Sequence, residues 1–168
     1  LGTNITQWTN SVNRSLTNHL KIITNLFYAK GARTLIAPNA VDLGKIPFYI
    51  NYAPANKAFI RSQIMNFNSR YEALLSNLTV SLPEFTIYSP NLFALLDDVV
   101  AYPTNYGLIK PTTHVIKDLP PSQWALDGPG TNYVYWYDFD PTAKYHMWIA
   151  DTVQQLISPV RITGITPL

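Results

Sequence analysis

Three side chains capable of acid–base chemistry lie on one short stretch near the C-terminal end of the sequence. They are Asp138, Asp140 and His146. A carboxylate can orient an imidazole ring, and an imidazole can take the proton of a nucleophilic hydroxyl group. One interpretation of this stretch is therefore catalytic, with Asp140, Asp138 and His146 as the candidate base and orienting groups.

The same stretch has a structural interpretation. Residues 134–136 predict a short apolar strand, and Asp140 followed by Pro141 predicts the start of a helix. Apolar residues at 149, 153 and 156 then recur at helical spacing. As an N-cap, Asp140 accepts hydrogen bonds from the first turn, and the positive end of the helix lowers its basicity. The N-cap role is the favoured interpretation of Asp140.

The other two histidines offer different possibilities. His19 falls on the polar flank of an expected helix, where solvation is its expected role. His114 lies in a long stretch without clear periodicity and can reach a cleft. The chain has no cysteine, and its His, Asp and Glu residues show no metal-ligand spacing. We therefore expect neither a metal nor a cofactor.

Composition sets the limits on the class of protein. The chain has 168 residues, is 47% hydrophobic and 13% charged, and carries a net charge of +2. These values are typical of one globular domain. The basic residues are scattered, which argues against a nucleic-acid partner, and no apolar run is long enough for a transmembrane segment. The low charge and missing cysteine favour a secreted or periplasmic protein.

The expected elements alternate between helices and short apolar strands. One helix is predicted at 8–28, with Asn10 or Ser11 as its N-cap and Lys30-Gly31 at its end. Further helices are predicted at 54–78 and after the expected cap Ser89-Pro90. Buried strands are predicted at 34–37 and 85–88, and a long irregular segment at 105–132. This alternation predicts an α/β fold with a mostly parallel sheet.

Two blocks of residues resemble one known family, the GDSL (SGNH) lipases and esterases. The C-terminal block matches that family's pattern at Trp136, Pro141, Thr142, His146, Ile149 and Ala150. An earlier block matches it at Gly31, Ala32, Arg33, Asn39, Leu43, Gly44 and Pro47. In the C-terminal block, Tyr137 stands where the family places its catalytic Asp, and Asp140 stands where it places its catalytic His.

The resemblance implies a three-layer α/β/α sandwich of the SGNH-hydrolase type, incomplete on its N-terminal side. Residues 1–157 would form the C-terminal part of that domain, and residues 158–168 a linker or the start of a further segment. The resemblance also makes Asn4, Asn39 and His114 candidates for contact with the substrate, although Asn4 also suits a turn or helix cap.

The implied function is hydrolysis of an ester, lipid or acetylated carbohydrate by a serine that lies outside this chain, because no Gly-Asp-Ser occurs in it. An N-terminal partner chain or a homodimer would then complete the sheet. The alternative is a non-catalytic SGNH-like domain that binds a ligand or partner. The replacements at Tyr137 and Asp140 favour that alternative.

Overall fold

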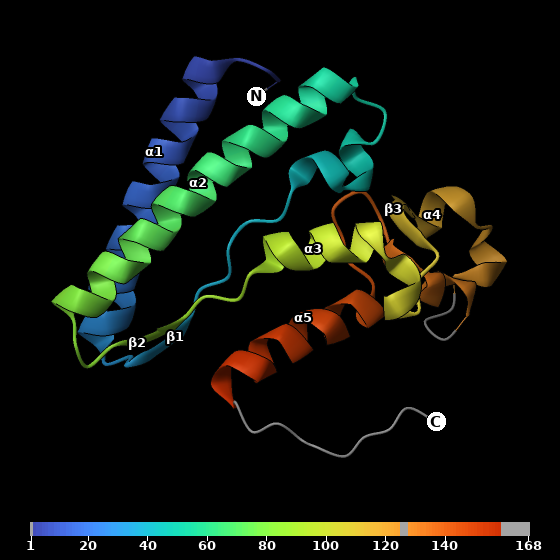
Figure 1. Cartoon of the computed structure of the whole chain (residues 1–168). Coiled ribbons are helices and arrows are strands. Elements are labelled where there is room, and N and C mark those ends of the chain that lie inside the picture. Colours follow the sequence, from blue (N-terminus) through green and yellow to red (C-terminus); the bar gives the residue numbers. More distant parts are fainter. Residues whose placement is uncertain (1, 125–127, 159–168) are drawn as a thin grey trace.

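The chain has an α/β structure in which helices predominate and the strands are short (Figure 1). The computed structural model describes residues 2–124 and 128–158. Its helices are α1 (Ile5–Lys21), α2 (Pro54–Ser81), α3 (Leu92–Ala101), α4 (Val115–Asp118) and α5 (Ala143–Ile157), and its strands are β1 (Thr34–Ile36), β2 (Thr86–Tyr88), β3 (Lys110–His114) and β4 (Tyr133–Tyr135).

Helix α1 begins earlier than its apolar pattern predicts. Asn4 is the N-cap, and its side chain accepts a hydrogen bond of 3.0 Å from the backbone N–H of Gln7. The predicted caps Asn10 and Ser11 are therefore wrong, because Asn4 satisfies the first turn. The predicted end is confirmed, since Gly31 has φ 98° and stops the chain in the left-handed conformation.

The last part of this helical segment departs from α geometry. Residues Ile22–Phe27 form a π-helical turn, and Tyr28–Lys30 a 3₁₀ turn. A π turn has more residues per turn than an α-helix, so it rotates later side chains away from the apolar face. Ile23 is 3% exposed, whereas Phe27, four residues further along the same helical segment, is 40% exposed.

Helices α1 and α2 share one hydrophobic core with the parallel strand pair β1–β2. Leu35 of β1 pairs in register with Ile87 of β2, and both side chains pack against this core. The prediction that 34–37 is a fully buried strand is wrong. Thr34 and Ile36 are exposed, because their side chains point to the opposite face, which no described helix covers.

A second core joins α3 and α5 to the parallel pair β3–β4. Leu96, Val99, Leu108 and Val134 are fully buried there. The irregular segment predicted for 105–132 is partly wrong, since it contains β3 and α4. The cap of α3 is Asn91 rather than Ser89 or Pro90, because the Asn91 side chain accepts a hydrogen bond from the N–H of Ala94.

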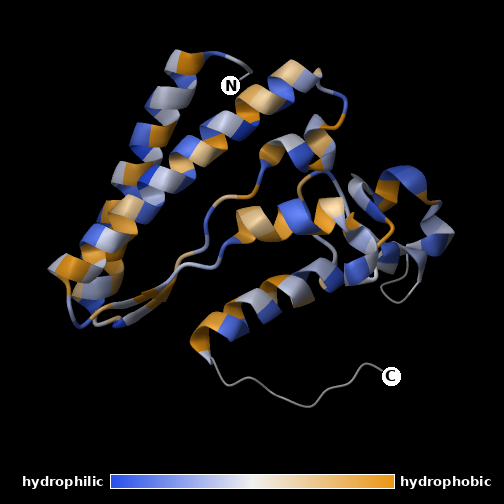
Figure 2. Cartoon of the chain, viewed as in Figure 1, coloured by the Kyte–Doolittle hydropathy of each residue, from blue (hydrophilic) through white to orange (hydrophobic). Residues whose placement is uncertain are grey.

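The four strands form two separate two-stranded sheets, so the described residues contain no continuous sheet. Polar and apolar residues alternate around the helices (Figure 2). None of the described helices is both long and apolar enough to cross a bilayer. Residues 159–168, most of the predicted linker, lie outside the described part of the chain.

One network of charges connects three segments far apart in the sequence. Arg61 of α2 makes a bidentate contact with Asp97 of α3, at 2.6 and 2.8 Å, and a 2.6 Å contact with Asp42 in the loop after β1. Lys45 lies 2.6 Å from Asp97. Asp42 is 2% exposed, so Arg61 neutralises a carboxylate that is almost out of water.

We predict that Arg61→Met lowers the free energy of unfolding by about 3 kcal/mol, because it leaves the buried Asp42 carboxylate without its cation. Urea unfolding of the whole chain measures this change. Glu84→Gln is the matched control, since it breaks an ion pair with Arg33 whose side chains are 47% and 77% exposed. The control should cost no more than about 0.5 kcal/mol. An equal loss in both variants would contradict the prediction.

We also predict a stability change in acid that depends on Asp97. The hydrogen bonds from Arg61, with Lys45 adding to them, lower the pKa of Asp97 from 3.8 to about 2. Because the folded pKa lies below the unfolded one, this stabilisation is fully present above about pH 4 and is lost as the pH falls towards 2. The stability difference between wild type and Asp97→Asn, about 2 kcal/mol at neutral pH, should therefore shrink over that interval. A difference independent of pH from 6 to 2 would refute this.

Candidate functional site

The start of α5 differs from the predicted one. Thr142 is the N-cap, and its hydroxyl oxygen accepts a hydrogen bond of 3.3 Å from the N–H of Tyr145. The same hydroxyl group donates to the carbonyl oxygen of Tyr133 at 2.8 Å. The N-cap prediction for Asp140 is wrong, because Thr142 both caps the helix and ties it to β4.

Asp140 instead closes the turn that follows β4. Its carbonyl oxygen accepts a 2.7 Å hydrogen bond from the N–H of Trp136. Pro141 forms an antiparallel bridge with Tyr135, so it lies beside the strand rather than in the first helical turn. The turn thus fixes the backbone of Asp140, and Asp140 itself is exposed to solvent.

This turn places Asp138 against His114, at the end of β3. The His114 Nε2 atom lies 3.3 Å from Oδ1 of Asp138, and the two side chains are 10% and 27% exposed. The other ring nitrogen, Nδ1, accepts a 3.1 Å hydrogen bond from the backbone N–H of Lys117 and so caps α4. An acceptor nitrogen carries no proton, so the geometry assigns the proton of the neutral ring to Nε2, facing Asp138.

A cavity of about 270 Å³ opens beside this pair. Its walls come from three separate segments, and its lining residues are Pro47, Phe48, Ile50, Asn51, Thr113, His114, Lys117 and Asp138. Phe48 also packs against Phe139 of the turn, with ring centroids 4.8 Å apart. Since each wall comes from a different segment, the cavity depends on how these three segments pack together.

The cavity favours binding of a polar ligand over acyl transfer by its own residues. The Nδ1 lone pair of His114 accepts from Lys117, and Nε2, which then carries the proton, faces Asp138, so the neutral ring has no free lone pair for a nucleophilic hydroxyl group. The Thr113 hydroxyl donates to Asp118 at 2.6 Å. No serine lines this cavity among the described residues. Lys117 adds a positive charge at its exposed side.

The structure brings together two of the six candidate residues, Asp138 and His114. Asp140 and His146 are exposed, and neither lines the cavity. Asn39 joins the loop after β1 to the start of α3, because its amide nitrogen donates to Asn91 and its oxygen accepts from the N–H of Phe93. Asn4, as described above, caps α1 and so has the structural role that also suits its sequence.

Sequence reasoning did not identify Phe48, Asn51 or Lys117 as neighbours of the candidate residues. Phe48 and Asn51 lie more than sixty positions before His114, and no motif signals that distance. The register of β3 beside β4 brings His114 opposite Tyr135, and hence close to the turn that follows. Among the described residues, no three His, Asp or Glu side chains lie close enough to hold a metal ion.

Comparison with known proteins reveals one informative similarity. The chain is 30% identical over 138 residues to GDSL esterase/lipase 7 of Arabidopsis thaliana. The matched part is 73% of this chain but only 37% of that relative, so the chain spans little more than a third of the relative's length. No family model matches the chain.

We predict that the neutral His114 ring carries its proton on Nε2. Long-range ¹H–¹⁵N correlation spectra distinguish the two ring tautomers directly. Asp138→Asn should weaken this preference, because an amide no longer favours a proton on the facing nitrogen. His146, which has no contact with Asp138, serves as the internal control. A proton on Nδ1 of His114 would disprove the assigned geometry and release Nε2 to act as a base.

Proposed function

We propose that this chain is part of a GDSL (SGNH)-type ester hydrolase that acts on an ester, lipid or acetylated carbohydrate. The observation that carries the proposal is the 30% identity to a GDSL esterase/lipase across 73% of the chain. The motif positions from Gly31 to Pro47 and from Trp136 to Ala150 agree with it. Because only 37% of the relative is covered, the activity belongs to the complete protein or complex.

In this proposal the nucleophilic serine lies outside the 168 residues. Support comes from the cavity beside His114 and Asp138, whose described lining contains no serine and whose Thr113 hydroxyl donates to Asp118. Asp138 is the carboxylate that we assign to the complete site, one position beyond the family's usual Asp. His114 would orient a polar group of the substrate through its ring, and Asp140 and His146 remain weaker candidates because they are exposed.

We extend the proposal to a three-layer α/β/α arrangement that additional chain completes. The β1 strand gives the physical reason. The carbonyl group of Arg33 and the N–H group of Ala37 bond to β2, so the backbone groups of Leu35, midway between them, also point towards β2. The backbone groups of Thr34 and Ile36 therefore point to the opposite edge of the strand. The side chains of Thr34 and Ile36 are also exposed. Parallel sheets are normally covered on both faces and extended at such edges.

A second candidate function is a non-catalytic domain that binds a polar ligand at the same cavity. The observation that favours it is the hydrogen bond from Lys117 to Nδ1 of His114, which occupies the lone pair that a general base would use. The replacements at Tyr137 and Asp140 agree with it.

Labelling with a fluorophosphonate probe, followed by intact-mass measurement, tests the proposed hydrolase. We expect the 168-residue chain alone to stay unlabelled and a further polypeptide, or a longer form of this chain, to be labelled in native material. Asp138→Ala should then lower ester hydrolysis at least tenfold with the fold intact, whereas His19→Ala should not. Labelling of the isolated chain would disprove an external serine. Native material without any labelled species would instead support the binding domain.

A further inference from the structure

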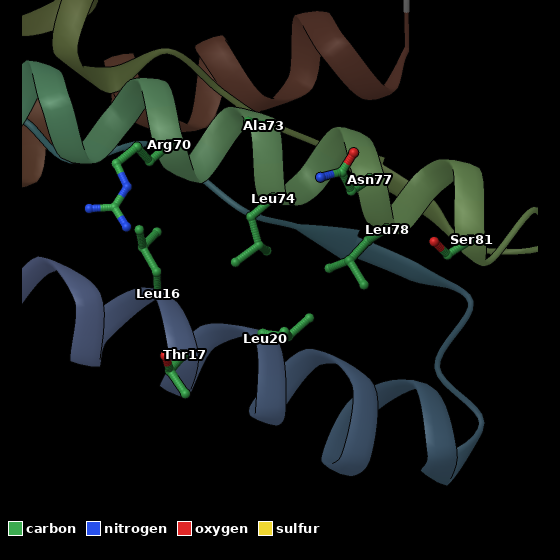
Figure 3. A pocket seen from close by; sticks show the side chains of 9 residues that line it. All are labelled: Leu16, Thr17, Leu20, Arg70, Ala73, Leu74, Asn77, Leu78 and Ser81. Carbon is green, nitrogen blue, oxygen red and sulfur yellow. The ribbon is translucent and has the colours of Figure 1, made fainter.

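A hollow lies between α1 and α2, and it shares no lining residue with the cavity beside His114 (Figure 3). Its volume is about 520 Å³, within the range of small-molecule sites. Leu16 and Leu78, which are 8% and 6% exposed, belong to the core beneath it, and the more exposed Leu20 and Leu74 form its walls. We call this hollow the α1–α2 groove.

Charge is distributed unevenly along the α1–α2 groove. Figure 3 shows Arg70 at one end, the leucines in the middle, and Ser81 at the other end. Arg70 donates a 2.8 Å hydrogen bond to the side-chain oxygen of Asn13, which is a neutral partner. Within the described residues no carboxylate pairs with Arg70, and none lines the groove. One end of an apolar groove thus carries a positive charge that no described carboxylate neutralises.

We infer that the α1–α2 groove binds a long alkyl chain with an anionic head group, such as a long-chain carboxylate. The head group would pair with the Arg70 guanidinium, which can donate two parallel hydrogen bonds to a carboxylate. The alkyl chain would lie along Leu20, Leu74 and Leu78 and remove their exposed surface from water.

The length and charge of the groove match a single alkyl chain with an anionic head group. From Arg70 to Ser81 the α2 axis advances about 16 Å, which fits an extended chain of about twelve carbons. Helices α1 and α2 already contact each other beneath the groove through the shared core. Leucines of both helices line this length and the cation lies at one end, which is the pattern that an alkyl chain with a charged head group requires.

This inference is independent of the proposed hydrolysis, because it concerns binding at a site remote from His114 and Asp138. A long-chain carboxylate is also what hydrolysis of a lipid ester releases. If both proposals hold, the groove would retain an acid product, but the binding measurement below requires no catalysis.

Isothermal titration of the chain with dodecanoate, below its micelle concentration, tests the inference. We expect saturable binding of one ligand, with shifts confined to the methyl signals of Leu16, Leu20 and Leu74 in NMR spectra. Dodecanol, which lacks the charge, and hexanoate, which lacks the length, should each bind at least tenfold more weakly.

Matched variants separate the groove from general adsorption. Arg70→Gln should weaken dodecanoate binding about tenfold, whereas Arg14→Gln, the same charge change outside the groove, should not. Leu20→Gln should weaken binding, whereas Val80→Gln, at a position 84% exposed and outside the groove, should not. The absence of saturable binding, equal effects of Arg70→Gln and Arg14→Gln, or a dimer that covers the groove would each overturn the inference.

Discussion

The contact between Arg61 and its two carboxylates is the constraint on which the rest of this structure depends. Helix α2, which carries Arg61, packs against the β1–β2 pair, whereas Asp97 belongs to α3, a helix of the second core. A buried cluster of Trp8, Ile60 and Ile64, packed against Phe93 of α3, also joins the two strand pairs with their separate cores. The nearly buried Asp42 makes the contact obligatory, because without Arg61 its charge would be uncompensated.

This arrangement determines how the cavity is assembled. The loop that contains Asp42 continues through Lys45 into Pro47 and Phe48, which form one wall of the cavity beside His114. The opposite side comes from the turn after β4, through Asp138. The ion network therefore lies at the base of the loop whose far end shapes the candidate site. Stability and site geometry are coupled through a few consecutive residues, so mutations at Arg61 affect both.

Helices with clear apolar periodicity were predictable from sequence, and long α2 is the best example. Its predicted start at Pro54 is confirmed, and its end lies three residues beyond the predicted one. Short elements were less predictable, because β3 contains Pro111 and α4 is held by the side chain of His114 rather than by periodicity. The pair Asp138–His114 could not be foreseen, since it arises from the alignment of β3 beside β4. The cap at Thr142 was missed, because Asp140 followed by Pro141 is also a good start for a helix, whereas only the fold shows that Thr142 reaches β4.

The π turn at Ile22–Phe27 has an evolutionary implication. Such a turn holds one residue more than the α-helical turn that it replaces, so one residue can be gained or lost there through a local change in winding. The segment immediately before Gly31 is thus a place where homologues can differ in length by one residue without losing α1 or β1. An alignment gap at this point would reflect a local change in winding, and the positions on both sides of it would remain structurally equivalent.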